Sequence, residues 1–312
     1  MTRKKILFFH AQPWVMGKIH SELAKALYPY VQADFADWLK PYEQDQFNFF
    51  IEKYDYIVTT LYGAYLTNHH WSVDPKQLIA ICHGNRCAVG GVEEGVDDEF
   101  VNSLAGVGVV SQSVKEFCEN DCGFTRAFPI LPIGVFADNY QKRDPNRPVT
   151  TIGNFADLSR PQKGLDGEVY DVKRGHLIKE LVAKTGMKFS HRTGAPNIAS
   201  ESIYNDTDIY AFAAVDEGNP MGLIEAAACG IPTIGPNTGV MPEAIAAGAA
   251  FELPMDEEGF IEEGTRLVEK LKTDKKFYRE ASMNALNWAT RDRDWAGLAW
   301  KYIQFFENPR AV

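Results

Sequence analysis

The residues best suited to chemistry in this chain lie in one segment, residues 216–245, which reads DEGNPMGLIEAAACGIPTIGPNTGVMPEAI. Two carboxylates, Glu217 and Glu225, stand eight positions apart within it. Asn219 is a favourable N-cap and Pro220 suits the first helical position. A helix is therefore predicted to begin between the two glutamates.

The start of this helix has the properties of an anion site. The first turn of a helix offers backbone N–H groups without partners and the positive end of the helix dipole. Glu217 is expected in the loop above that end, and Glu225 about 9 Å further along the axis, at ~1.5 Å per residue. A nucleoside diphosphate sugar, with an anionic middle and hydroxyl groups on both sides, would match this arrangement. An amphipathic helix with two solvated glutamates is the alternative.

Length and composition describe a folded protein of two ordinary domains. The chain has 312 residues, of which 45% are hydrophobic and 24% charged, enough for a substantial core. Its net charge of −10 argues against nucleic acid as a partner, because phosphate binding needs a basic surface. The same charge disfavours electrostatic docking on an anionic membrane, although a local basic patch would leave peripheral membrane contact open.

We expect neither a transmembrane segment nor a signal peptide. No apolar run approaches the ~18 residues that a membrane span requires, and the one in MTRKKILFFHAQPW is too short for a signal peptide. The five scattered cysteines indicate reduced thiols and a cytoplasmic location. Because no second paired set of cysteines is present, they are interpreted as small buried side chains and not as a metal site.

The order of apolar runs and helical segments predicts an α/β protein with doubly wound sheets. In the first half, strands are expected at residues 5–9, 56–61, 78–82 and 107–110. The polar, proline-containing segment 138–148 predicts a domain boundary. The domains are therefore placed at residues 1–140 and 149–290, followed by an amphipathic helical segment over 291–312.

Over the segment 216–245, the chain carries E-G-x-x-x-x-L-x-E-A-x-A-C-G-x-P followed by G-V-x-P-E. This pattern resembles the donor-site signature of the family-4 retaining glycosyltransferases, which have the GT-B fold. The resemblance implies two Rossmann-like domains that face a cleft, and a last helix that packs back on the first domain. It also implies a donor site made of Glu217, Gly218, Asn219, Pro220, Met221, Gly222 and Glu225.

Two further segments resemble the family and also depart from it. ILPIGVFADNY (130–140) is similar to the family's V-I-P-N-G-V-D, with two polar positions replaced. The family's G-R-L element reads Gly-Asn-Phe, so Asn154 stands where a diphosphate-binding arginine is expected. By the resemblance, Lys163 in the K-G element binds the diphosphate, and Arg160 is a candidate for the missing charge.

The resemblance also points to a histidine in the first half. His83 follows a predicted strand, where family members often carry a histidine near the donor sugar. A structural, hydrogen-bonded histidine is the alternative. His83, Glu217 and Lys163 are the candidate catalytic residues. Thr193, in a glycine loop where relatives contact the base, is a candidate donor contact.

The acceptor is expected to contact loops of the first half. The glycine pair that the family has after its first strand is reduced here to Gly17, with Trp14 beside it. The aromatic segment 61–71, with His69 and His70, follows another strand and is interpreted as a candidate acceptor loop. Simple aromatic packing beneath a loop is the alternative for this segment.

The predicted function is transfer of a hexose from a nucleoside diphosphate sugar to a glycan, lipid or small-molecule hydroxyl, with retention at the anomeric carbon. No metal or other cofactor is expected to be required, because cationic side chains and helix N–H groups would stabilise the leaving diphosphate. A monomer and a homodimer are both compatible with the sequence. Two alternatives are a non-catalytic nucleotide-sugar-binding protein, which Asn154 keeps open, and a GT-B nucleotide-sugar epimerase, which needs further acids and bases.

Overall fold

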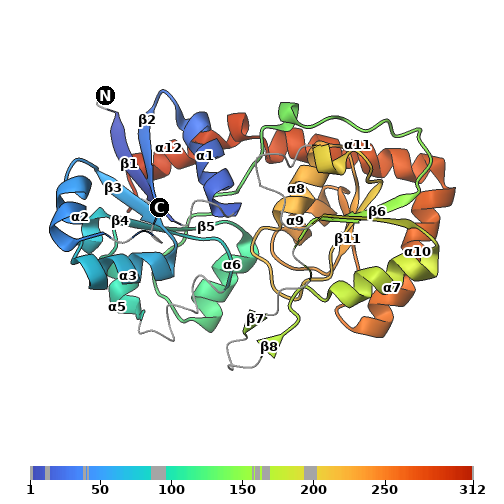
Figure 1. Ribbon diagram of the computed structural model, residues 1–312, viewed down its shortest axis with the longest axis horizontal. Coiled ribbons are helices and arrows are strands. Elements are labelled where there is room, and N and C mark those ends of the chain that lie inside the picture. Colours follow the sequence, from blue (N-terminus) through green and yellow to red (C-terminus); the bar gives the residue numbers. More distant parts are fainter. Residues whose placement is uncertain are drawn as a thin grey trace. The chain divides into compact units, whose positions relative to one another are not determined.

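The structure is a computed structural model that describes residues 3–10, 15–37, 40, 42–85, 96–156, 158, 162–163, 169–192 and 202–310. The chain divides into unit 1, made of Met1–Ile133 and Trp295–Val312, and unit 2, made of Gly134–Asp294. Each unit contains a parallel five-stranded sheet with helices around it (Figure 1). The predicted α/β class with two doubly wound sheets is therefore confirmed.

The sheet of unit 1 has the strand order β2-β1-β3-β4-β5, and all its pairings are parallel. Its strands are β1 (Lys4–Phe9), β2 (Val31–Ala36), β3 (Tyr56–Thr59), β4 (Leu78–Cys82) and β5 (Gly106–Val109). All residues of β4 and β5 are buried, as is usual for strands that helices cover on both faces. The carboxyl ends of β1 and β4 carry His10 and His83.

Several helices of unit 1 begin at residues whose side chains cap them. They are α1 (Val15–Leu27), α2 (Gln44–Ile51), α3 (Leu61–Trp71), α5 (Asp98–Ser103), α6 (Gln112–Glu116) and α12 (Trp295–Glu307), with the short helices η1 (Pro75–Gln77) and η2 (Phe117–Asp121). The Asp97 carboxylate accepts a hydrogen bond from the Phe100 N–H at 2.8 Å, and the Ser111 hydroxyl accepts one from the Val114 N–H at 3.4 Å. Both caps follow the usual pattern, in which an Asp or Ser side chain accepts a hydrogen bond from the N–H group three residues ahead.

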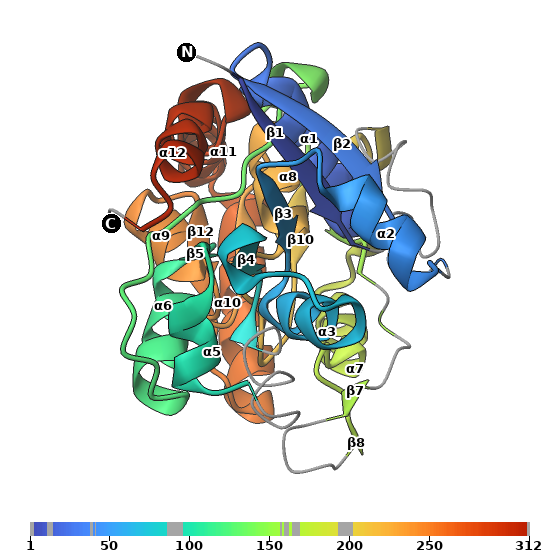
Figure 2. The same ribbon diagram turned by 90° about the vertical axis from the view of Figure 1, so that its left-hand side faces the viewer.

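The prediction that residues 61–71 form a loop is wrong, because this segment is helix α3. The Thr60 hydroxyl caps the helix by accepting a hydrogen bond from the Gly63 N–H at 3.0 Å. Leu61 and Ala64 are fully buried, and α3 packs on β4 (Figure 2). Capping and burial therefore outweigh the preference of the aromatic residues for extended structure.

Helix α12 returns the end of the chain to unit 1 and packs on α1 (Figure 1). The indole N–H of Trp295 donates a hydrogen bond to Oε2 of Glu22, a residue of α1, at 3.0 Å. The Tyr302 hydroxyl donates to the Leu131 carbonyl at 2.9 Å. Both aromatic side chains are buried, so apolar packing and hydrogen bonding act together here. The predicted return helix is confirmed.

The sheet of unit 2 has the order β12-β11-β10-β6-β9, again with parallel pairings. Its strands are β6 (Thr151–Asn154), β9 (Lys188–His191), β10 (Ile209–Ala211), β11 (Thr233–Gly235) and β12 (Ala250–Glu252). A separate antiparallel pair, β7 (Gln162–Lys163) and β8 (Val169–Tyr170), follows β6 in the chain. Strand β10 is central in the main sheet, and the candidate donor segment follows its carboxyl end.

The helices of unit 2 cover this sheet and close its core. They are α7 (Gly175–Thr185), α8 (Met221–Ala228), α9 (Met241–Ala246), α10 (Glu257–Thr273) and α11 (Lys275–Asp292), with the short helix η3 (Ala137–Asn139). Helix α7 packs on α10, and α8 packs on α11. Leu181, Ile234 and Phe260 are among the fully buried side chains of the core. Among the residues that the structure describes, no helix is both long and apolar enough for a membrane span.

A buried ion pair holds the first residues of unit 2 against its sheet. Arg143 and Asp208 form this pair, with side chains only 3% and 1% exposed. The Asp208 carboxylate also accepts hydrogen bonds from the backbone N–H groups of Thr150 at 2.6 Å and Thr151 at 2.9 Å. The Arg143 guanidinium donates to the Tyr278 hydroxyl at 3.2 Å. Each charge therefore has several polar partners, as buried ions require.

Candidate functional site

Helix α8 presents its N-terminus beyond the carboxyl end of β10, the edge at which ligands bind in parallel sheets. The helix begins at Met221, and Pro220 occupies the N-cap without a side-chain cap. The expected N-cap Asn219 is therefore wrong. Its Nδ2 lies 3.6 Å from Sδ of Met221, and its buried Oδ1 has no hydrogen-bond partner among the described residues. The first N–H groups of α8, at Met221 and Gly222, receive no cap from the N-cap residue and suit an anion.

Two glycines allow the close approaches that build this loop. A Cβ atom at Gly222 would collide with the Tyr210 hydroxyl. Gly239 has a φ of +58°, and a Cβ atom there would lie 2.6 Å from the Glu217 carbonyl oxygen. The G-V-x-P-E turn thus packs directly against the loop that carries Glu217. This contact explains why both parts of the sequence pattern belong to one site.

Glu217 forms an ion pair with Lys173, which lies two residues before α7. The two side chains are 20% and 21% exposed, so the pair is mostly buried. Lys173 was not identified from the sequence. A lysine directly ahead of a helix start, with Gly175 two residues later, is the signal that could have identified it. The structure thus brings a cationic group to the loop above α8.

Arg174 fixes the backbone that carries Lys173. Its φ is +43°, in the left-handed region that residues other than glycine rarely occupy. Its guanidinium is buried and donates hydrogen bonds to the carbonyl oxygens of Ala213, at 2.6 Å, and Met255. Ala213 lies between β10 and Glu217. One side chain therefore ties the turn of Lys173 to the segment that leads to its ion-pair partner.

Glu225 is buried inside unit 2, where its carboxylate meets two tyrosines. The Tyr204 hydroxyl donates a hydrogen bond to Oε2 at 2.6 Å, and the Tyr140 hydroxyl donates to Oε1 at 3.2 Å. Burial, and then the charge of Glu225, raise the pKa of Tyr204 well above its ordinary value, so this hydroxyl keeps its proton and remains a donor. Neither tyrosine was identified from the sequence.

Asn154, which stands where the family has an arginine, has a structural role in this chain. Its Nδ2 donates a hydrogen bond to the Ala211 carbonyl at 2.8 Å, and its Oδ1 accepts one from the Ala156 N–H at 2.9 Å. It is 1% exposed and links the ends of β6 and β10. It supplies no positive charge. Lys173 is the described cation that stands beside Glu217.

Several residues predicted for the site are not placed by this structure. Lys163 has its backbone in β7, but its side chain is outside the described part of the chain. Arg160, Thr193 and Trp14 also lie outside the described residues. Their assignments stay predictions.

The candidate acceptor residues that the structure describes in unit 1 lie on helices. Gly17 is a buried residue of α1. His69 and His70 are exposed in the last turn of α3, where Nδ1 of His69 lies 3.0 Å from the Tyr65 carbonyl oxygen. The assignment of these residues to an acceptor surface stays a prediction.

His83 belongs to a cluster of three histidines in unit 1. Nδ1 of His20 lies 3.0 Å from Nδ1 of His10, and the ring centroids of His20 and His83 are 5.6 Å apart. Burial lowers the pKa of His10 to about 4 and, with the neighbouring His10, that of His83 to about 3. Burial lowers the pKa of His20 as well. All three rings are therefore neutral at pH 7, and in that state an imidazole can both donate and accept a hydrogen bond.

The neutral histidine cluster predicts that unit 1 loses stability in mild acid. An unfolded histidine titrates near pH 6.5, whereas the pKa of folded His10 is about 4. Between these values the unfolded chain binds more protons, so the free energy of unfolding falls as the pH decreases from about 6.5 to about 4. At ~1.4 kcal/mol per pKa unit, His10 alone accounts for roughly 3 kcal/mol.

Urea unfolding at pH 7.5, 6 and 5 measures this effect. The variant His10→Gln removes one titrating group and should show a flatter dependence of the free energy of unfolding on pH. The same dependence in the variant and the wild-type protein would contradict the assignment.

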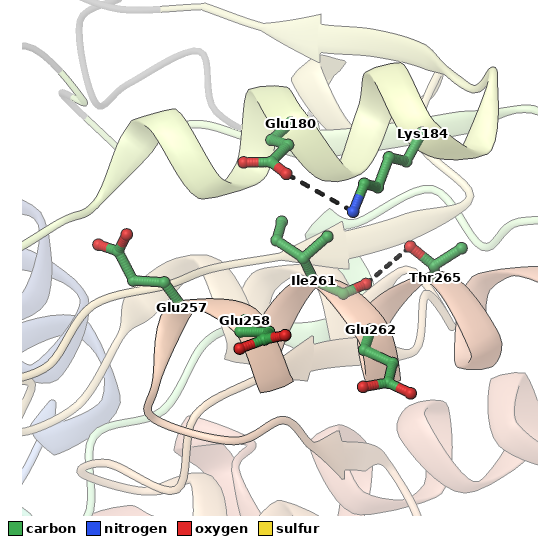
Figure 3. A pocket seen from close by; sticks show the side chains of 7 residues that line it. All are labelled: Glu180, Lys184, Glu257, Glu258, Ile261, Glu262 and Thr265. Atoms are coloured by element: carbon green, nitrogen blue, oxygen red, sulfur yellow. Dashed lines mark hydrogen bonds and ion pairs between the residues drawn. The ribbon is translucent and has the colours of Figure 1, made fainter.

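A cavity of about 590 Å³ lies elsewhere in unit 2, between α7 and α10 (Figure 3). Its lining consists of Glu180, Lys184, Glu257, Glu258, Ile261, Glu262 and Thr265. Four carboxylates against one lysine, itself 3.7 Å from Glu180, would repel a diphosphate. This cavity is therefore not the donor site. Within the described ranges, no group of three His, Cys, Asp or Glu residues is arranged to hold a metal ion.

Sequence comparison relates part of the chain to known proteins. A profile of the family described as glycosyl transferases group 1 matches residues 133–288, half of the chain. The serotype-specific mannosyltransferase WbdA of Escherichia coli is 32% identical over 105 residues. That match covers 34% of this chain and 12% of the length of WbdA. The profile match includes the whole of segment 216–245.

Comparison with solved structures extends the similarity to the whole fold. Sucrose-phosphate synthase from Thermosynechococcus elongatus aligns with a TM-score of 0.71 at 12% identity, over 98% of both chains. Anabaena Alr3699/HepE in complex with UDP and glucose aligns with a TM-score of 0.70 at 14% identity, over 98% of this chain and 100% of its own. At these identities the likeness concerns the fold, which is the predicted GT-B arrangement of two parallel sheets and a returning helix.

Proposed function

This chain belongs to the glycosyl transferases group 1 family, and on that basis we propose that it transfers a hexose from a nucleoside diphosphate sugar to a hydroxyl acceptor, with retention at the anomeric carbon. The observation that carries the proposal is the arrangement around α8. Glu217 with Lys173, the N-terminus of α8 and Glu225 follow one another along a single loop and helix. Their chemistry matches sugar, diphosphate and ribose in that order.

The leaving group is stabilised by positive charge that the protein holds in place. As the bond between the anomeric carbon and the phosphate oxygen breaks, negative charge grows on the diphosphate. The N–H groups at Met221 and Gly222 face it, and the Lys173 ammonium can move to it from Glu217. Lys163, with its own predicted phosphate role, would add to this charge. These groups supply the stabilisation without a metal ion.

Release of Lys173 leaves the Glu217 carboxylate to accept hydrogen bonds from hydroxyl groups of the donor sugar. The acceptor hydroxyl then attacks the anomeric carbon from the face that the diphosphate leaves. Its oxygen forms the new glycosidic bond, and its proton passes to the departing phosphate oxygen. This front-face displacement needs no separate base, which agrees with assigning Glu217 to orientation of the sugar. Both ring nitrogens of His83 are buried and have no hydrogen-bond partner among the described residues, and the assignment of His83 to the donor sugar stays a prediction.

Two relatives support the choice of a hexose donor. The E. coli relative is named a mannosyltransferase, and the Anabaena protein was solved with UDP and glucose. The acceptor is proposed to be a glycan, a lipid-linked sugar or a small hydroxyl compound, and its recognition is assigned to unit 1.

An assay with a panel of nucleotide sugars tests the proposed activity. The protein is incubated with UDP-, GDP- and ADP-hexoses and a set of hydroxyl acceptors, and released nucleoside diphosphate is followed. Acceptor-dependent release is the expected result. Binding without turnover would indicate a nucleotide-sugar-binding protein, and a free epimerised nucleotide sugar would indicate an epimerase.

Replacing Glu225 with alanine should weaken binding of the nucleoside diphosphate by about 10- to 100-fold, because hydrogen bonds to a charged group contribute roughly 1.5–3 kcal/mol. Calorimetric titration with the diphosphate released in the assay measures this loss. Glu262→Ala, which removes an exposed carboxylate of α10 in the same unit, is the matched control. Unchanged affinity for the Glu225 variant would rule out its proposed contact with the nucleotide.

A further inference from the structure

Another cavity, of about 470 Å³, lies in unit 1 at the amino ends of its first two strands. Lys4, the first residue of β1, and Val31, the first residue of β2, both line it, and α12 forms a further wall. Ligands of a parallel sheet bind beyond the carboxyl ends of its strands. This cavity is therefore at the edge of the sheet opposite to the one expected to hold the substrates.

The cavity has an apolar floor and a rim of exposed aromatic rings. Phe306 in the floor is 1% exposed, whereas Tyr30 at the rim is 62% exposed. Trp300, 53% exposed, stands one turn of α12 before the lining residue Ile303 and so lies on the same side of that helix. Tyr28 is 69% exposed. All the exposed Tyr and Trp side chains of the described residues thus gather around one cavity.

Cations surround these rings. The Arg3 guanidinium lies 4.9 Å from the centre of the Tyr28 ring. The Tyr28 N–H donates to the carbonyl of Lys25 at 3.3 Å, which places this exposed lysine beside the same residue. The positive charges outnumber the carboxylates: Arg3, Lys4, Lys5 and Lys25 stand against Asp55, which lies 3.8 Å from Lys4, and Glu307, which lines the cavity.

We propose that this face, made of the three exposed rings and the cations around them, docks unit 1 on the surface of a membrane that contains anionic lipids. Tyr and Trp rings concentrate at the headgroup level of bilayers, because each combines an apolar ring with a polar O–H or N–H group. Lys and Arg beside them contact lipid phosphates, and each such cation strengthens binding by roughly fivefold. The inference goes beyond the proposed transfer activity, because it concerns where unit 1 binds and not which reaction is catalysed.

The net charge of the chain makes such docking depend on this face. At −10 the average surface is repelled by anionic lipids, so the protein approaches them only through a locally positive region. A protein partner or a second copy of the chain is the alternative for exposed apolar groups. Lysine is depleted from protein–protein interfaces, whereas most of the cations at this face are lysines, which favours a lipid surface.

Co-sedimentation of the full-length protein with vesicles tests the inference. Vesicles of phosphatidylcholine alone are compared with vesicles of an equal mixture of phosphatidylcholine and phosphatidylglycerol. The protein should bind the mixed vesicles and leave the neutral ones largely free, and added salt should weaken binding because it screens exposed charges. Equal binding to both kinds, or to neither, would overturn the inference and leave the proposed transfer activity untouched.

A first pair of variants tests the role of the cations. Arg3→Gln with Lys25→Gln should weaken binding to the mixed vesicles by about 25-fold, from roughly fivefold for each cation. Lys40→Gln with Lys115→Gln is the control, since it removes the same charge from residues that follow the carboxyl ends of β2 and β5. It should bind like the wild-type protein. Equal losses in the two double variants would show that net charge, and not this face, determines binding.

A second pair tests the aromatic rings. Tyr30→Ala with Trp300→Ala should weaken binding by about tenfold or more, because both rings lose their contact with the headgroup layer. Phe49→Ala is the control: Phe49 is 81% exposed on α2, which lies across unit 1 from α12 (Figure 2). Circular dichroism shows whether each variant is folded, as expected for exposed positions.

Analytical ultracentrifugation of the wild-type protein tests for a second copy on this face. A monomer is consistent with the inference. A dimer that Tyr30→Ala with Trp300→Ala dissociates, or vesicle binding that neither double variant weakens, would overturn it.

Discussion

Replacing Lys173 with alanine should lower kcat by about 10²- to 10³-fold, the usual cost of removing one preorganised group that stabilises transition-state charge. Lys173 is the described cation beside Glu217 and the loop above α8, and Asn154 contributes no charge there. The KM for the donor should change less than kcat, because charge on the diphosphate grows as its bond to the sugar breaks. Steady-state kinetics with saturating acceptor measures both constants.

Three variants sharpen this experiment. Lys173→Arg keeps the charge and should retain more activity than the alanine variant. Lys179→Ala removes an exposed lysine of α7 and should behave like the wild-type protein. Lys163→Ala tests the lysine chosen from the sequence pattern, and a large loss of turnover is expected there too. Wild-type kcat for Lys173→Ala would exclude this residue from the chemistry.

Replacing Arg143 with alanine should lower the free energy of unfolding by about 3–5 kcal/mol, because it leaves the buried carboxylate of Asp208 without its ion-pair partner. The effect is large because Asp208 is 1% exposed and water cannot replace the guanidinium easily. Urea unfolding followed by circular dichroism measures it. Arg147→Ala, in the same segment but exposed, is the control and should change the free energy little.

A second variant shows whether the loss of stability in Arg143→Ala comes from the broken ion pair or from lost packing. The double variant Arg143→Met with Asp208→Asn keeps the approximate volume and removes both charges. It should be more stable than Arg143→Ala, since no uncompensated charge remains buried. A double variant as unstable as Arg143→Ala would show that packing, and not charge, determines the loss.

Many elements of the fold were predictable because their signals are local. The caps Asp97 and Ser111 bond to N–H groups three residues ahead, so sequence spacing alone identifies them. Strand β4 was predicted with its observed bounds from one apolar run. The loop predicted over residues 61–71 was wrong because the burial of Leu61 and Ala64 against the sheet is not visible in the local pattern.

In the donor segment, too, some features were predictable from the local sequence and others depend on side-chain contacts. Glu217 and Glu225 were found from sequence because a helix start places them by its own geometry. The helix nevertheless begins one residue later than predicted, since the side chain of Asn219 turns toward Met221 and does not cap. Differences of this size at a helix end arise from side-chain contacts that spacing does not specify.

The sequence by itself determined that a helix N-terminus lies between two carboxylates, because caps, proline and glycine act over a few residues. Only the tertiary structure decided which groups meet those carboxylates. Lys173 is 44 positions from Glu217, and Tyr140 is 85 positions and Tyr204 21 positions from Glu225. Contacts over such separations depend on how the strands are ordered in the sheet and how its helices pack, and no periodicity or spacing in the chain records that order.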